Sequence, residues 1–319
     1  MFAVYAARAE PLDPLSALVV GERPEPELAP GWIAVRVRAA SINHHDLWTL
    51  RGVGIAADAF PMILGCDAAG IDPQGREVVV HSVIGGGPDE TLDPARSLLS
   101  EKFQGTFADI VVVPAANVVP KPRELSWAEA ACLPTAWLTA YRMLVTRGQL
   151  QPGETILVQG VGGGVATACI ALGRALGLRV WATSRDQARS AGALELGADA
   201  VFVPGARLPE RVDAVMETVG AATWEHSVKS LRPGGRIVIS GATTGANPPA
   251  DLTRIFFKQL SVIGSTMGTR EELADLIDLC LRTGLRPLVD RELPMSDAAA
   301  GLAAVAAGDV FGKIVLTRD

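Results

Sequence analysis

The sequence predicts an α/β protein in which a β-rich region precedes a doubly wound parallel sheet. From residue 154 to 240, short apolar runs that suit buried strands alternate with helical segments. This alternation is typical of right-handed βαβ units around a parallel sheet with helices on both faces. The first ~120 residues instead carry short strand patterns separated by Pro and Gly, with little helical periodicity. With 319 residues, the chain is long enough for two domains.

The β-rich region is predicted from alternating side chains. Residues 32–40 alternate apolar and polar side chains with a period of two, which indicates a half-buried antiparallel strand. Further strands are expected at 77–80 and 109–113, and a long irregular surface loop at 85–104. The strand-like tail, residues 312–317, is expected to return to this region.

The second region begins with a helix signal. Ser126 and Glu129 have the spacing of a capping box before an alanine-rich helix. Pro134 is expected to interrupt this helix, which restarts to carry Thr139. Beyond it the pattern predicts strands at 154–159, 179–183, 200–203, 212–217, 236–240 and 260–264, and helices at 163–176, 186–196, 223–231 and 270–282.

A glycine-rich turn joins the first of these strands to its helix. Its residues are Gly160, Gly162, Gly163, Gly164 and Val165. Backbone N–H groups at a helix N-terminus bind anions, and glycine lets a pyrophosphate approach the main chain closely. Because a strand precedes the turn and a helix follows it, the sequence predicts a dinucleotide site here. A tight turn without a ligand is the alternative.

The end of the next strand indicates which dinucleotide binds. An NAD site usually has Asp or Glu there to bind the ribose 2′-hydroxyl. This chain has Ser184 and Arg185, with Arg189 one helical turn later. A hydroxyl and two guanidinium groups suit a 2′-phosphate, so we expect NADP(H). In the alternative, Ser184 only caps the helix and both arginines are solvated.

Composition limits the partners and the compartment. The formal net charge is −6, which gives no global attraction to nucleic acid or to an anionic membrane. No apolar run approaches the roughly 20 residues that span a bilayer, and residues 1–5 do not begin a signal peptide. The four cysteines lie far apart without a CxxC pair, which favours a reducing compartment. We therefore expect a cytoplasmic protein that acts on a small molecule.

Several short motifs follow one another in a characteristic order. They are ASINHHDL at 40–47, ILGCDAAG at 63–70, GTFAD at 105–109, VVPKP at 118–122, TAY at 139–141, LGAD at 196–199 and LRPGGR at 231–236. With these motifs, nearly the whole chain resembles the medium-chain dehydrogenase/reductase superfamily, the group of zinc-type alcohol dehydrogenases and quinone oxidoreductases.

The resemblance implies a domain plan and a reaction. A GroES-like catalytic domain is expected at residues 1–122 and 266–319, and a Rossmann NADP(H)-binding domain at 123–265, with the active site in the cleft between them. The reaction implied is hydride transfer from the nicotinamide. A homodimer is also implied, because the apolar segments 255–257 and 260–263 lie at the sheet edge where dimers of the family pair.

The resemblance also bears on metal binding. In the zinc enzymes of the family, the catalytic ligands are Cys, His and Cys at the positions that hold Asn43, Cys66 and Thr135 here. None of the three keeps its ligand type, and residues 81–104 contain none of the four cysteines of the structural zinc lobe. We therefore expect no metal.

A rebuilt zinc site from His44 or His45 with Cys66 and Asp46 is the alternative, because a catalytic zinc needs three convergent ligands and partners that orient them. More often, residues such as His44 and His45 are loop residues, one facing the cleft and one packed or hydrogen-bonded. Cys66 is then a small buried residue.

The chemistry expected without zinc is hydride addition to an acceptor that is already electrophilic, such as a quinone or an α,β-unsaturated carbonyl. A hydrogen-bond donor then stabilises the enolate or phenolate. The resemblance implies Asn43 for this role, because zinc-less members carry Asn in the matching loop. His44 or His45 would relay a proton.

The family also implies the remaining cofactor contacts. Lys313 stands where a basic residue often contacts the pyrophosphate, although an exposed strand lysine is an equally good interpretation. The residues expected around the nicotinamide are Thr139, Gly241, Ala242, Ser265 and Thr266.

Three functions are compatible with these residues. The first is a zinc-independent, NADPH-dependent oxidoreductase that reduces a quinone or an α,β-unsaturated carbonyl. The second is an alcohol dehydrogenase or ketone reductase with an altered or absent zinc site. The third, of another class, is a non-catalytic NADP(H)-binding sensor or scaffold.

Overall fold

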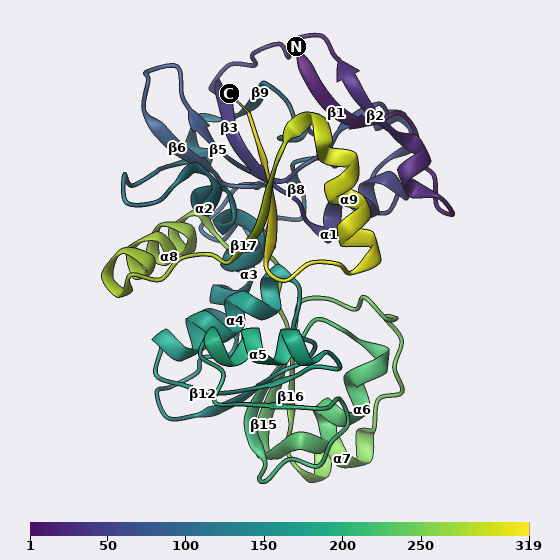
Figure 1. Ribbon diagram of the computed structural model, residues 1–319, viewed down its shortest axis with the longest axis vertical. Coiled ribbons are helices and arrows are strands. Elements are labelled where there is room, and N and C mark those ends of the chain that lie inside the picture. The colour runs from purple at the N-terminus through teal and green to yellow at the C-terminus, as the bar shows by residue number, and fades with distance from the viewer. Residues whose placement is uncertain (319) are drawn as a thin grey trace. The chain divides into compact units, whose positions relative to one another are not determined.

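The computed structural model describes residues 1–318, and the chain divides into two compact units (Figure 1). Unit 1 contains Met1–Leu138, Met267–Leu281 and the residues from Arg286 onward. Unit 2 contains Thr139–Thr266 and Arg282–Leu285. Unit 1 thus continues past residue 122, where the first domain was expected to end. The predicted α/β class is confirmed.

Unit 1 is built around a largely antiparallel sheet with the order β10-β6-β5-β3-β18-β17, and β9 pairs with the first half of β3. The predicted strand at 32–40 is confirmed as β3, and the predicted return of the tail is confirmed because β18 pairs with β3. The strands are β3 (Trp32–Ser41), β5 (Asp67–Ile71), β6 (Glu77–Val80), β9 (Ile110–Pro114), β10 (Val118–Pro120), β17 (Val289–Pro294) and β18 (Lys313–Thr317).

Smaller elements complete unit 1. A second sheet pairs β1 (Phe2–Ala6) with β2 (Leu18–Glu22) and β4 (Met62–Ile63). The segment expected to be irregular, 85–104, contains β8 (Ser97–Leu98), which pairs antiparallel with β7 (Val83–Ile84) just before the segment. The helices are α1 (His44–Leu50), α2 (Trp127–Ala131), α8 (Arg270–Thr283) and α9 (Ala298–Ala307).

Two of these helices differ from the sequence prediction. α1 forms where a loop was expected, and the Asp46 carboxylate at its third position accepts the Asn43 N–H at 2.8 Å. This bond satisfies one of the amide groups that a helix N-terminus leaves unpaired. α9 was not predicted, because its ten residues are all Ala, Gly, Leu or Val and carry no polar stripe.

Unit 2 contains a parallel sheet with the order β13-β12-β11-β14-β15-β16. The predicted alternation of strands and helices is confirmed, except that α7 was missed and β15 begins at Leu231, so the Pro-Gly-Gly sequence lies inside it. The elements are β11 (Thr155–Val158), α4 (Gly164–Ala175), β12 (Arg179–Thr183), α5 (Gln187–Glu195), β13 (Ala200–Phe202), β14 (Val212–Glu217), α6 (Ala221–Ser230), β15 (Leu231–Ile239), α7 (Leu252–Phe257) and β16 (Ser261–Gly264).

The helical segment between residues 127 and 147 does not break at Pro134. The predicted capping box of Ser126 and Glu129 is confirmed by both of its hydrogen bonds. Pro134 is accommodated in a π-helical turn, Leu133–Trp137, before α3 (Leu138–Arg142). The wider turn tolerates a residue that lacks an N–H group, so the chain stays helical.

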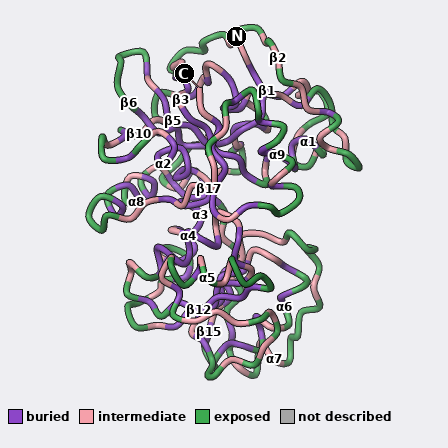
Figure 2. The backbone as a smooth tube through the Cα atoms, viewed as in Figure 1, coloured by how far each residue is buried: buried purple, intermediate pink, exposed green. Residues whose placement is uncertain are grey.

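Burial follows the strands. Figure 2 shows buried residues concentrated in the sheets of both units, with exposed residues mostly in connections and on outer helix faces. Within residues 1–318, no helix is both long enough and apolar enough to cross a membrane.

Candidate functional site

The glycine-rich turn of unit 2 leaves its main chain open to a ligand. It connects β11 to the twelve-residue helix α4. Gly160 has a φ of +73°, which a side chain would strain, and its N–H donates to Thr183 Oγ1 at 2.9 Å. A Cβ atom built on Gly163, which precedes the helix, would meet nothing within 4 Å. The turn therefore offers amide groups and free space at one helix N-terminus.

Two unpaired hydroxyls lie at the same edge of the sheet. Ser240 directly follows β15, and Ser265 directly follows β16. Both Oγ atoms are buried and have no hydrogen-bond partner within residues 1–318. Because all strands run parallel, these residues share the carboxyl edge with the glycine turn, where open α/β sheets bind ligands. A buried hydroxyl without a partner is costly, so polar atoms of a ligand would satisfy it.

Most of the residues expected to contact the nicotinamide are next to these two serines in the chain. Gly241 and Ala242 follow Ser240, Ser265 is itself one of the predicted residues, and Thr266 is exposed beside it. Thr139 lies in α3 and is buried. The free main chain of the turn and the orphaned hydroxyls fit a dinucleotide, while each single contact stays a prediction.

The segment expected to bind a 2′-phosphate follows β12. Arg185 is exposed and Arg189 is partly buried. The alternative in which Ser184 caps α5 is wrong, because Asp186 is the N-cap and its Oδ1 accepts the Arg189 N–H at 2.8 Å. Ser184 Oγ instead bonds to the main chain of Asp186, at 2.9 Å to its carbonyl and 3.1 Å to its N–H.

Sequence reasoning missed the position of Asp186. Its carboxylate lies next to Arg185, and a carboxylate repels a phosphate. Because this carboxylate caps α5, the helix N-terminus partly compensates its negative charge. The signal was available in the sequence as Asp directly before the helical run.

In unit 1, three side chains far apart in the sequence form one buried network. Asn43 Nδ2 donates to Asp67 Oδ2 at 2.8 Å, and Lys313 Nζ donates to Asn43 Oδ1 at 2.6 Å. Lys313 Nζ also donates to Ile42 O at 2.7 Å and lies 3.6 Å from Asp67 Oδ2. The Ser41 hydroxyl donates to the same Asp67 oxygen at 2.6 Å. The lysine charge and the aspartate charge are thus buried together.

The structure changes the interpretation of Lys313. With 3% exposure, it is not the exposed strand lysine that the sequence allowed. Its ammonium group makes two hydrogen bonds and one ion pair within unit 1. Its contact with a pyrophosphate stays a prediction.

Asn43 is less available than expected. Its second Nδ2 hydrogen bond goes to Ser41 O at 3.2 Å, so both amide protons are directed at protein oxygens. An amide group has only two such protons. A direct donor role toward a substrate oxygen therefore conflicts with this network, and Asn43 instead positions Asp67 and Lys313.

His45 is the hydrogen-bonded member of the histidine pair. Its Nε2 lies 3.1 Å from Glu101 Oε1, and its Nδ1 lies 3.2 Å from Cys66 Sγ. Burial acts to raise the pKa of Glu101, but hydrogen bonds from His45 and from the Leu98 N–H outweigh it and hold that pKa below its usual value.

His44 differs from its neighbour. It is the first residue of α1 and is exposed, and no hydrogen bond to its ring occurs among the described residues. Partial desolvation of the ring and the positive charges of Lys313 and Arg51 lower the pKa of its imidazole. The ring is therefore neutral near pH 7 and free to donate one hydrogen bond.

The positions that bind catalytic zinc in the family do not fit a metal. Lys313 Nζ lies 2.6 Å from Asn43 Oδ1, so a cation held by Asn43 would be repelled by the ammonium group. Thr135 Oγ1 lies 3.5 Å from Ser82 Oγ, and a neutral hydroxyl does not replace a thiolate ligand.

A second group of potential ligands lies nearby. Within residues 1–318, one group of His, Cys and acidic residues has ligand atoms within 4.8 Å of one another, and it is formed by His45, Asp46 and Cys66. The structure thus brings together the alternative site proposed from the sequence, with His45 rather than His44.

The ligand atoms of this group already make hydrogen bonds within the protein. Burial raises the pKa of the Cys66 thiol well above its usual range, and the carboxylates of Asp46, Asp67 and Glu101 raise it further. The Cys66 thiol donates to Leu99 O at 3.2 Å. Asp46 Oδ1 accepts the Gly65 N–H at 3.0 Å, and Oδ2 caps α1. A metal ion bound here would have to displace the thiol proton and compete with these hydrogen bonds.

The glycine turn and the β-rich unit can be compared with known proteins. Residues 29–123 match the family model of the alcohol dehydrogenase GroES-like domain, and residues 164–282 match that of zinc-binding dehydrogenases. The chain is 28% identical to the zinc-type alcohol dehydrogenase-like protein YogA of Leptosphaeria maculans, over 95% of this chain and 94% of that protein.

Two further proteins extend the comparison. Acryloyl-coenzyme A reductase of Metallosphaera sedula is 28% identical over 93% of this chain and 96% of its own length. The crystal structure of an NAD-dependent alcohol dehydrogenase matches with a TM-score of 0.92 and 32% identity, and the match covers 100% of both chains. With both family models in order and this full-length match, the chain belongs to the medium-chain dehydrogenase/reductase superfamily.

Proposed function

We propose that the protein is an NADPH-dependent oxidoreductase that reduces a carbon–carbon double bond conjugated to a carbonyl group, without a metal ion. The observation that carries this proposal is the buried network of Asn43, Asp67 and Lys313, because it holds an ammonium group 2.6 Å from Asn43, one of the three positions that align with the family's zinc ligands. Without a Lewis acid, an acceptor that is already electrophilic is the easiest substrate. Similarity to acryloyl-coenzyme A reductase supports the same class of acceptor.

The proposed chemistry assigns one role to each residue. Bound NADPH would supply the hydride, which is added to the β-carbon of the acceptor. The electron pair of the double bond then moves toward the carbonyl oxygen, and a proton from water completes the α-carbon. His44, with its neutral and unengaged ring, donates a hydrogen bond to the developing enolate oxygen. Asn43 and Lys313 act as positioning residues through Asp67.

The assay that tests this function measures NADPH oxidation with a simple enone, a quinone and the matching saturated ketone. We expect turnover with the enone and little with the ketone. His44→Phe should lower kcat/KM for the enone by roughly a hundredfold, since a positioned acid or base contributes about 10²–10⁴. His44→Gln keeps a donor and should recover part of that loss. Absence of turnover with every acceptor would leave a cofactor-binding sensor or scaffold, and equal activity of His44→Phe would exclude His44 as the donor.

A second candidate function is a metal-dependent alcohol dehydrogenase or ketone reductase. The convergence of His45, Asp46 and Cys66 favours it. Glu101 is hydrogen-bonded to the other ring nitrogen of His45, as is a carboxylate that orients a histidine ligand of a metal. Under our proposal, elemental analysis of the protein purified without chelator finds far less than one zinc ion per chain. One zinc per chain that is lost in Cys66→Ala, but kept in the control Cys169→Ala of unit 2, would favour the second function.

The choice of NADP(H) over NAD(H) rests on Arg185 and Arg189, which follow β12 where a 2′-phosphate is expected. Two guanidinium groups there suit a phosphate better than a hydroxyl. Because a similar structure is that of an NAD-dependent alcohol dehydrogenase, the dissociation constants of NADPH and NADH test this choice.

We further propose a homodimer that pairs through β16. This strand ends the sheet of unit 2, and it carries Val262, which is 47% exposed. Phe256 and Phe257 of the adjacent α7 are 66% and 81% exposed. An apolar edge strand offers unpaired main-chain groups to a second copy.

Light scattering after size exclusion tests the dimer. We expect Val262→Asp to convert a dimer into a monomer, because a carboxylate would be desolvated in the paired edge. The control is Val203→Asp, where Val203 is 67% exposed and follows the strand at the opposite edge of the sheet. A wild-type monomer, or equal behaviour of the two variants, would refute pairing through β16.

A further inference from the structure

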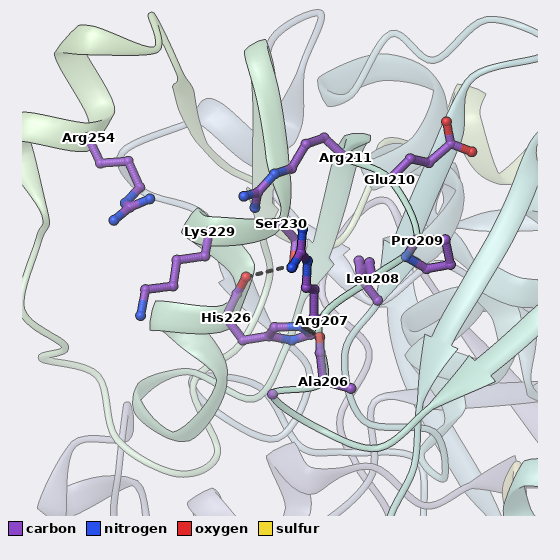
Figure 3. Close-up of a pocket in the computed structure, with 11 residues that line it drawn as sticks. Ala206, Arg207, Leu208, Pro209, Glu210, Arg211, His226, Lys229, Ser230 and Arg254 are labelled. Atoms are coloured by element: carbon purple, nitrogen blue, oxygen red, sulfur yellow. Dashed lines mark hydrogen bonds between the residues drawn. The ribbon is translucent and has the colours of Figure 1, made fainter.

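Unit 2 contains a pocket of about 490 Å³ (Figure 3). Its walls are the loop 205–211, one face of α6 and a side chain of α7. Arg211 directly precedes β14 and Ser230 directly precedes β15, so this side of the pocket is at the amino ends of the strands. The glycine turn follows the carboxyl end of β11, at the opposite edge of the same sheet. The pocket is therefore separate from the dinucleotide site.

Positive charge dominates the pocket. Its lining includes the side chains of Arg207, Arg211, Lys229 and Arg254. In Figure 3 the charged ends of Arg207, Arg211 and Lys229 surround the C-terminal half of α6, while the Glu210 carboxylate points away from them. Glu210 pairs with Arg179 instead. The one acidic residue of the lining is thus engaged outside the cluster.

The remaining carboxylates nearby compensate only two of the four cations of the pocket. Asp251 pairs with Arg254 at 2.9 Å, and Glu225 pairs with Lys229 across one turn of α6. Arg207 and Arg211 form no ion pair with any residue that the structure describes. The cluster therefore keeps two uncompensated guanidinium groups, which are both exposed to a ligand.

Lys258, beside the pocket, is close enough to these cations to be affected by their charge. Lys258 Nζ donates to Leu231 O at 3.0 Å, beside the pocket. Burial and the charges of Arg211 and Arg254 lower the pKa of Lys258. Like charges held this close raise the free energy of the empty pocket, and an anion would relieve that repulsion.

The loop that carries the arginines is held in place by partly buried hydrogen bonds. His226 Nε2 lies 2.9 Å from Ala206 O, and its Nδ1 lies 3.0 Å from Gln159 Nε2. These partners make Nε2 the donor to the loop carbonyl and Nδ1 the acceptor from the Gln159 amide. The Gln159 Oε1 atom accepts the Thr183 hydroxyl at 2.9 Å, and Thr183 in turn accepts the Gly160 N–H. The pocket wall is thus fixed before any ligand binds, which lowers the cost of binding.

We propose that this pocket binds a phosphate-bearing small molecule through Arg207 and Arg211. Guanidinium groups bind phosphate oxygens in a bidentate manner, and the volume lies within the range of small-ligand sites. Leu208 and Pro209 provide an apolar wall for the rest of such a ligand. A nucleic acid is disfavoured, because the net charge of the chain is −6 and the cations gather in one pocket. This site does not depend on the proposed reaction.

Calorimetric titration with inorganic pyrophosphate tests the site. We expect Arg207→Ala/Arg211→Ala to weaken pyrophosphate binding at least about tenfold, since hydrogen bonds between charged groups contribute about 1.5–3 kcal/mol each. The matched control is Arg8→Ala/Arg123→Ala, which removes the same charge from two exposed positions of unit 1 and should bind as the wild type does. All four arginines are exposed, so the variants should fold, which circular dichroism verifies.

Three results would overturn the proposal. Unchanged affinity in Arg207→Ala/Arg211→Ala would assign pyrophosphate to another place, such as the glycine turn. Equal weakening in both double variants would reduce the effect to general charge. The same would follow if sodium chloride bound as strongly as pyrophosphate at the same ionic strength. Tighter binding of an RNA oligonucleotide or of anionic phospholipid vesicles than of pyrophosphate would mean that the arginines serve a macromolecular surface.

Discussion

Lys313→Met should lower the free energy of unfolding by about 3–5 kcal/mol, the usual cost of removing one partner of a buried ion pair. Lys313 is 3% exposed and Asp67 is 0% exposed, so neither charge is compensated by water. Without the ammonium group, Asp67 keeps a buried negative charge, and Asn43 Oδ1 loses its donor. Urea unfolding at neutral pH, compared with the wild type, measures the loss.

Two further variants separate the ion pair from simple loss of packing. Asp67→Asn combined with Lys313→Met removes both charges and should recover most of the stability. Lys121→Met is the control, because Lys121 is also a buried lysine of unit 1, but the side chain of its partner Glu77 is 44% exposed. We expect that control to lose only about 1 kcal/mol. A loss in Lys313→Met no larger than in Lys121→Met would show that the network does not hold the site together.

Arg185→Ala should weaken NADPH binding by roughly tenfold to a hundredfold and leave NADH binding nearly unchanged. The reason is that only NADPH carries the 2′-phosphate, and the exposed Arg185 follows the strand that ends beside the glycine turn. Quenching of protein fluorescence by each dinucleotide gives both dissociation constants.

The control for this variant is Arg174→Ala. Arg174 lies at the end of α4 in the same unit, and its side chain is 65% exposed. Its removal changes the net charge equally, so both dinucleotides should bind as they do to the wild type. If Arg185→Ala weakened NADPH and NADH by the same factor, the arginine would contact a part that the two cofactors share. The assignment of the 2′-phosphate would then be wrong.

The sequence predicted those features that depend on neighbouring residues. The strand, glycine turn and helix around Gly160 are continuous in the chain, and hydrophobic periodicity is a local property. The capping box of Ser126 and Glu129 is local in the same sense. The order of strands and helices in unit 2 followed from these patterns.

The features that were missed depend on contacts across the chain or on competition between neighbours. The return of the tail was predicted, but the contacts of Lys313 with Asn43 and Asp67 depend on which strand β18 pairs with and in which register, and no periodicity reveals these. The separate roles of His44 and His45 depend on Glu101, which comes from a distant loop. The cap of α5 was misassigned because two good capping residues, Ser184 and Asp186, stand close together; Asp186, directly before the helix, is the N-cap.

The position of a transferred label tests the central claim most directly. The protein is treated with chelator and given an enone and NADPH that carries deuterium at the transferable C4 position, and the product is analysed by mass spectrometry and NMR. Our account expects a saturated carbonyl compound with deuterium on its β-carbon. An allylic alcohol with deuterium on the former carbonyl carbon, formed only when zinc is restored, would contradict metal-free reduction of a conjugated double bond.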